Sequence, residues 1–246
     1  MRAYISGGAR GSHVILACLA AADSLWPGFE ERWSRVLSKH NLRWWRAADA
    51  MSMAGHPRAA LVDPDLGWDR SRALAAVDEL GGVIRDTHAE HFDACTLRSG
   101  VQIASCVVDM DAHSEAKSRN PRLPSAGAIC ANVCVAAVLG IDETPGVLHV
   151  DQGEGLVQEV AEAWSRERTS PNAEEIRIET VRQVRDAHLA RGLQAADLLV
   201  WSTGDGVRRA AEEGGPRANI FGRLSHYYGL EDIERDYPLT KEAGPR

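Results

Sequence analysis

Apolar residues gather in two short runs at the start of the chain. Residues 2–6 read RAYIS and residues 13–20 read HVILACLA, and both runs are rich in residues that favour strands. Between them lies GGARGS at 7–12, whose glycines suit a tight turn. The chain is therefore predicted to open with a β-hairpin.

Further along the chain, helical and strand-like patterns of apolar positions alternate. We predict helices at about residues 26–40, 69–91, 124–140 and 155–168, and a last one around Asp197. We predict strands at residues 101–109, 146–152 and 176–184. Residues 49–68 are rich in Gly, Pro and Met, which is typical of a loop or lid. This order of elements predicts an α/β fold with a mixed β-sheet flanked by helices.

The last of these helices holds a carboxylate on an apolar face. In GLQAADLLVW at 192–201, Asp197 shares a face with Leu193, Val200 and Trp201 at helical spacing. A buried carboxylate is costly unless it is protonated, hydrogen-bonded or bound to a cation. The sequence leaves two readings open for Asp197, a metal ligand shared with other acids or a structural hydrogen-bond acceptor.

Length and composition indicate one globular unit. With 246 residues and 44% hydrophobic content, the chain can bury a full core. We predict a single domain over residues 1–236 with an insertion at about 41–100, and a flexible tail at 237–246. No apolar stretch reaches the length of a membrane span and no secretion signal is visible, so we expect a cytoplasmic protein with no membrane association.

The net charge of −7 argues against general nucleic-acid binding, but the charge is unevenly distributed. Residues 1–60 hold eight basic and four acidic side chains. Several of these cations lie beside Trp33, Trp44 and Trp45, a mixture that suits a strand of nucleic acid. The alternative is an amphipathic helix with a solvated basic face and a tryptophan anchor.

The cysteines and the remaining polar clusters indicate structure rather than chemistry. Of five cysteines, three lie in apolar runs, and Cys95 and Cys106 have no CxxC partner, so neither a disulfide framework nor a zinc site is expected. Asp109, Asp111 and His113 follow a predicted strand and superficially resemble a metal cluster. A turn rich in helix-capping groups is the favoured interpretation.

Four segments together resemble one bacterial family. The most specific is LQAADLL at 193–199, supported by AYI at 3–5, by the WSRVLSKHNLRWW run at 33–45 and by LHVDQGEG at 148–155. In order and spacing, residues 2–205 resemble the domain-of-unknown-function 3800 family. The resemblance implies a ribonuclease H-like mixed β-sheet flanked by helices, with a helical insertion.

This resemblance also implies a site for two Mg²⁺ or Mn²⁺ ions, held by acids on the first strand, a central strand and the last helix. Asp151 would be the central-strand acid and Asp197 the helix acid. His149 alternates with Asp151 along the strand, so it would face the same side and assist proton transfer or orient the acid. Glu154 is a further candidate ligand, or else a first-turn acid that favours a helix N-terminus.

The chain departs from the family pattern at two places. Where the family carries Asp-Glu-Ser-Gly at the end of the first strand, this sequence reads Ser6 to Ala9, so the first-strand carboxylate is missing. A hydroxyl is a neutral ligand, and metal affinity at such sites depends on ligand charge. After the first long helix Asp49 is kept as a candidate acid, whereas Arg46 replaces a histidine and is a candidate to bind substrate phosphate, with Ser6.

Two functional hypotheses follow. In the first, the protein is a divalent-metal-dependent phosphodiesterase that acts on nucleic acid, with Asp151 and Asp197 as ligands and Asp49 or Glu154 supplying the missing charge. In the second, it is a catalytically inactive ribonuclease H-like domain that serves as a nucleic-acid- or protein-binding module. A metal site requires the carboxylates of Asp151 and Asp197 to converge within about 5 Å.

Overall fold

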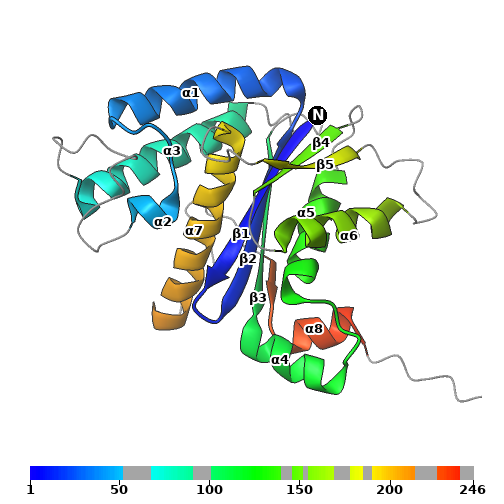
Figure 1. The fold of residues 1–246 in the computed structure, drawn as a ribbon. Coiled ribbons are helices and arrows are strands. Elements are labelled where there is room, and N and C mark those ends of the chain that lie inside the picture. Colours follow the sequence, from blue (N-terminus) through cyan, green and yellow to red (C-terminus); the bar gives the residue numbers. More distant parts are fainter. Residues whose placement is uncertain are drawn as a thin grey trace, which may run out of the picture.

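A six-stranded mixed sheet forms the centre of the structure (Figure 1). The computed structural model describes residues 1–51, 68–90, 101–139, 146–151, 155–168, 178–184, 190–213 and 226–238. Its strands lie in the order β5-β4-β1-β2-β3-β6. They span β1 (Arg2–Arg10), β2 (His13–Ala21), β3 (Gln102–Asp109), β4 (Gly146–Asp151), β5 (Ile178–Val184) and β6 (His226–Tyr228).

The strand directions make this a mixed sheet. β2 pairs antiparallel with both β1 and β3, whereas β4 is parallel to β1, β5 to β4 and β6 to β3. Among the described strands, β2 alone therefore runs against the others. The sheet and the helices around it confirm the predicted α/β fold with a mixed β-sheet flanked by helices.

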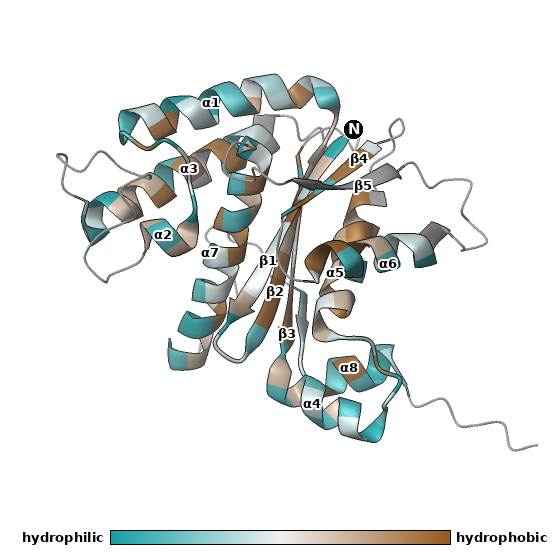
Figure 2. Cartoon of the chain, viewed as in Figure 1, coloured by the Kyte–Doolittle hydropathy of each residue, from teal (hydrophilic) through white to brown (hydrophobic). Residues whose placement is uncertain are grey.

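Helices cover both faces of the sheet (Figure 1). One face packs against α1 (Trp26–Lys39), α3 (Arg70–Glu90) and α7 (Arg191–Glu213), and the other packs against α5 (Ala126–Leu139) and α6 (Leu156–Arg168). Alternate residues of each strand point to opposite faces, so the sheet divides the core into two apolar clusters. Figure 2 shows the apolar residues concentrated along the strands and on the helix sides that meet them.

The opening hairpin is present, but its first strand is longer than predicted. Gly7 and Gly8 belong to β1, which pairs with β2 from the Arg2–Ala21 pair to the Arg10–His13 pair. The turn is the two-residue loop Gly11-Ser12, in which Gly11 has φ +58°. Glycine at the first loop position suits the tight turns that match the twist of a hairpin.

The other predicted helices and strands are observed with small shifts at their ends. Four short elements were not predicted, namely η1 (Asp23–Leu25), α2 (Ala47–Ala50), α4 (Met110–Arg119) and α8 (Leu230–Asp236), and β6 was missed as well. The predicted capping turn is confirmed, because the Asp109 carboxylate accepts hydrogen bonds from the amides of Asp111 and Ala112 at the start of α4. Most of the predicted lid, residues 52–67, lies outside the described residues, as do residues 239–246 of the predicted tail.

The described cysteines are small buried hydrophobes. Cys18, Cys106, Cys130 and Cys134 are unpaired and buried, and all four lie in the cluster beneath α5. Burial raises the pKa of the Cys130 thiol well above its ordinary value, which keeps it protonated. Cys95 lies outside the described residues. None of the described helices is long and apolar enough to cross a membrane.

Helix α7 lies unusually close to strand β1 because it carries glycine where the two elements meet. A Cβ added at Gly192 would lie 2.2 Å from the Tyr4 ring. That ring cannot move aside easily, because Trp26 packs against it edge-on with centroids 4.6 Å apart and His149 stacks on it at 4.9 Å. The start of α7 can therefore pack directly on β1 only because residue 192 has no side chain.

We expect Gly192→Ala to destabilise the protein, because the added methyl group must displace α7 or the Tyr4 ring. Overpacking of this kind costs about 1–3 kcal/mol. Gly82→Ala in α3 is the matched control: its new Cβ would meet only the Arg85 guanidinium at 3.7 Å, so better helix propensity should stabilise the protein by up to about 1 kcal/mol. Urea denaturation measures both, and equal effects would contradict the packing argument.

Candidate active site

Two polar residues on one side of α7 bind the segment that follows α1. Gln194 is buried, and its Oε1 accepts hydrogen bonds from Trp33 Nε1 and from the Trp45 backbone amide, both at 2.9 Å. One turn later, Asp197 Oδ2 accepts a hydrogen bond of 2.5 Å from the Ala47 amide. Because residues three apart share a helix face, α7 holds residues 45–47 through two side chains.

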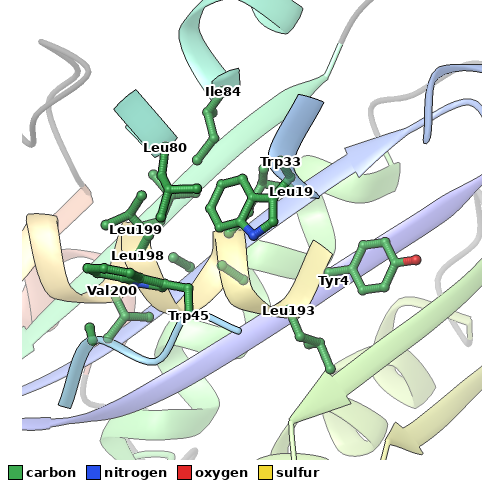
Figure 3. Packing of buried hydrophobic residues seen from close by; sticks show 14 of the residues in the cluster. Tyr4, Leu19, Trp33, Trp45, Leu80, Ile84, Leu193, Leu198, Leu199 and Val200 are labelled. Carbon is green, nitrogen blue, oxygen red and sulfur yellow. The ribbon is translucent and has the colours of Figure 1, made fainter. Parts of the chain in front are cut away.

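The tryptophans of this segment belong to the core. Trp33 and Trp45 are 0% and 1% exposed, and Figure 3 shows them packed among Leu80, Leu198 and Leu199. Rings this deeply buried cannot stack on bases, so the predicted nucleic-acid surface is wrong for these two residues. The amphipathic helix with a tryptophan anchor was the better interpretation.

Ser6 and Asp151 face α7 from the sheet. The parallel register pairs Tyr4 with His149 and Ile5 with Val150, which brings Ser6 level with Asp151. Ser6 Oγ donates a hydrogen bond of 3.5 Å to Asp151 Oδ2. Burial alternates along β4, so His149 and Asp151 share a face, and the stacking of His149 on Tyr4 identifies it as the face toward α7.

The electrostatics connect Asp151 with Asp197. Partial burial raises the pKa of Asp197 from 3.8 to about 6, against the opposing effects of the Ala47 amide and the charges of Arg10 and Arg46. The charge of Asp151 raises this pKa further. The two carboxylates on β4 and α7 are therefore close enough to repel each other, while their convergence within about 5 Å stays a prediction.

Two guanidinium groups act on the same carboxylate. Arg46 is exposed and has extended backbone immediately before α2, and Arg10 is the last residue of β1. Within the described part of the chain, neither side chain donates a hydrogen bond or forms an ion pair. Because both lower the pKa of Asp197, they lie near enough to attract an anion that approaches the site.

Arg10 was missed by the sequence analysis, although a signal was present. Tyr4, Ser6, Gly8 and Arg10 follow the period of two that puts side chains on one face of a strand. The assignment of GGARGS to a turn ended the predicted strand before Arg10. Extending the strand through the two glycines would have placed Arg10 on the side of Ser6.

The other predicted site residues have different outcomes. His149 lies beside Asp151 on the β4 face, stacked on Tyr4. Asp49 lies in α2, two residues after the amide that Asp197 binds, and is partly buried. Glu154 lies outside the described residues. Among the residues that are described, no three His, Cys, Asp or Glu side chains form a group able to hold a metal ion.

Comparison with solved structures gives a distant likeness. The structure of the PCNA:RNase HII complex from Archaeoglobus fulgidus matches with 13% identity and a TM-score of 0.43, covering 96% of this chain and 85% of that one. No model of a protein family matches the chain, and no curated protein does. The resemblance to the domain-of-unknown-function 3800 family therefore stays a prediction.

We expect Gln194→Met to destabilise the fold by about 2–4 kcal/mol. The substitution keeps the volume but leaves the buried donors of Trp33 and Trp45 without their acceptor, at about 1–3 kcal/mol each. Gln158→Met, on the exposed side of α6, is the control and should change stability by less than about 0.5 kcal/mol. Urea denaturation followed by tryptophan fluorescence measures both; a loss no greater than that of the control would rule out the anchoring role.

Proposed function

We propose that the protein is a divalent-metal-dependent phosphodiester hydrolase that acts on nucleic acid, with Asp151 and Asp197 as its central acids. The observation that carries the proposal is the placement of the two acids. Asp151 lies beside Ser6 on the β4 face toward α7, and Asp197 of α7 binds the Ala47 amide near enough for the charge of Asp151 to act on it. Two repelling carboxylates on facing elements favour any cation that binds between them. Carboxylate oxygens are also the ligands that Mg²⁺ and Mn²⁺ prefer.

The donors present partly fit such a cation. Asp197 binds the Ala47 amide through Oδ2, and a carboxylate has a second oxygen that can serve as a ligand. Ser6 adds a neutral hydroxyl beside Asp151 instead of a third charge. When bound, Mg²⁺ or Mn²⁺ would polarise a phosphoryl oxygen and stabilise the charge that develops during hydrolysis.

The chain's own residues would orient the substrate around these acids. Arg10 and Arg46 would attract the phosphate group, because the charges of both already act on Asp197. Ser6 would keep the Asp151 carboxylate in place through its hydrogen bond. His149, on the same face of β4, would carry a proton to or from the reacting group.

A second candidate function is a binding module that has lost hydrolysis. Two observations favour it: Ser6 stands where the resemblance expects an acid, and Asp197 has a structural task in binding the Ala47 amide. Such a module would keep the two arginines and bind nucleic acid or a protein partner without cleaving phosphodiesters. The two candidates differ in whether a metal ion binds and whether cleavage follows.

Metal binding should raise the melting temperature of the protein. We expect millimolar Mn²⁺ to raise Tm by about 3–6 °C relative to chelator, because the cation binds only the native state. Asp151→Asn and Asp197→Asn should each abolish this rise and reduce Mn²⁺-dependent cleavage of DNA or RNA about a hundredfold. Asp86→Asn, on the exposed side of α3, is the control.

The results separate the two candidates. A rise in Tm and cleavage that both depend on Asp197 support the hydrolase. Binding of nucleic acid without any metal-dependent rise or cleavage supports the module and rejects the hydrolase.

The raised pKa of Asp197 predicts a pH dependence of stability. Because the folded state binds this proton more tightly than the unfolded state, unfolding free energy falls as pH rises from 3.8 to about 6. Asp197→Asn removes the charge and keeps an oxygen for the Ala47 amide. We expect its stability relative to wild type to improve by on the order of 2 kcal/mol between about pH 4 and pH 8.

Urea denaturation across this pH range, without metal, measures the effect. Asp86→Asn should show no such trend. If the stability difference between Asp197→Asn and wild type does not vary with pH, the fold does not raise the pKa of Asp197, and the prediction is wrong.

A further inference from the structure

A groove of about 460 Å³ lies between the tip of the β1–β2 hairpin and the C-terminal half of α7. We name it the hairpin groove. Its volume falls within the range of about 300–1,000 Å³ that is common for small-molecule sites. The residues that matter for its chemistry are Arg10, His13, Ile15, Trp201, Val207 and Arg208.

The groove continues from the candidate active site. On α7, Trp201 follows Asp197 by four residues and Gly204 follows it by seven, so all three share a helix face. The axial distance from Asp197 to Gly204 is about 10 Å. On the facing strand, Arg10 lies four residues beyond Ser6 on the same side of the sheet, and its charge acts on Asp197. A linear ligand at the carboxylates can therefore extend into the groove.

Arg10 differs from the other arginines at the groove in its ion pairs. On the α7 side, Arg208 binds Asp205 at 2.7 Å and Glu212 at 2.6 Å, and Arg209 binds Asp205 at 3.1 Å, so these charges offset one another. Arg10 has no such partner among the residues described. The Arg10 guanidinium can therefore bind an anionic group of a ligand at this end of the groove.

The position of Arg10 is set by its packing on α7. A Cβ at Gly204 would lie 3.4 Å from Arg10 Cγ and 3.6 Å from its Cβ, so the aliphatic stem passes directly over this glycine. With the stem held in this way, less rotamer freedom is lost when the guanidinium binds a ligand.

Beside this cation the groove offers an aromatic and apolar wall. Trp201 is half-buried, packs on the core on one side and lines the groove on the other. Val207 adds a little apolar surface, and Ile15 lies buried beneath the groove. A flat aromatic ring with a negatively charged group attached suits this combination, and a nucleotide has both parts.

We propose that the hairpin groove binds one nucleotide of a single-stranded nucleic acid, with its base against Trp201 and its phosphate on Arg10. A base within a duplex is stacked and paired, so it is not free to lie against an indole ring. The inference rests on the proposed function, because the same strand would pass the carboxylates of Asp151 and Asp197. It adds the substrate class, a single strand.

Fluorescence anisotropy in the presence of chelator tests the groove independently of hydrolysis. The probes are a short fluorescein-labelled oligothymidylate and a labelled DNA duplex of equal length. We expect wild type to bind the single strand at least about tenfold more tightly than the duplex. Arg10→Gln and Trp201→Leu should each weaken single-strand binding about tenfold, and Arg10→Gln should lower the salt dependence of log K by about 0.7.

Matched variants control for charge and folding. Arg35→Gln removes an equally charged side chain from the exposed side of α1 and should leave binding unchanged. Trp201→Phe keeps an aromatic ring and should restore most of the affinity lost in Trp201→Leu. Melting temperatures within a few degrees of wild type show that each variant is folded.

The outcomes distinguish this inference from the proposed function. Single-strand binding that depends on Arg10 and Trp201 supports the groove even where Mn²⁺-dependent cleavage is absent. Cleavage that depends on Asp197, together with binding indifferent to Arg10 and Trp201, overturns the groove and leaves the hydrolase intact. Equal affinity for duplex and single strand also overturns it.

Discussion

The close contact between α7 and β1 is the constraint on which the site depends. Gly192 lets the start of the helix reach the Tyr4 ring, and Gly204 lets its middle pass over Ile15 and the stem of Arg10. An aspartate side chain is short, so Asp197 can act on groups of the sheet only if its helix is held this near. The same packing that completes the core therefore also brings an acid toward Asp151.

Polar contacts from α7 also fix residues 45–47. Gln194 and Asp197 accept three hydrogen bonds from Trp33, Trp45 and Ala47. Asp197 thus has two roles that oppose each other. Its bond to the amide favours the ionised form, whereas partial burial and the charge of Asp151 disfavour it. A carboxylate in this balance responds strongly to any added charge, which a purely structural acceptor on the surface would not do.

Local patterns in the sequence predicted most of the fold and part of the site. Long segments such as α1, α3 and α7 were predicted because apolar residues recur at helical spacing over several turns, which seldom arises by chance. The short elements α4, α8 and β6 carry too few apolar positions for such a signal. Arg10 was missed because glycines suggested a turn inside β1. Trp33 and Trp45 bind Gln194, which is about 150 residues away in sequence, so no local pattern shows that they belong to the core. Only tertiary packing could settle the role of that tryptophan cluster.

Serine instead of an acid at position 6 changes the charge of the site. With an acid at this position, the site would hold three negative charges, and a divalent cation would be the natural counterion. With serine, the charges of Asp151 and Asp197 are matched by those of Arg10 and Arg46. A phosphodiester brings one more negative charge into this balanced site, and either a cation or a proton on Asp197 can offset it. The proposed phosphate recognition would therefore need only the residues already in place, whereas the proposed hydrolysis would require a cation to bind with fewer anionic ligands than the family pattern implies.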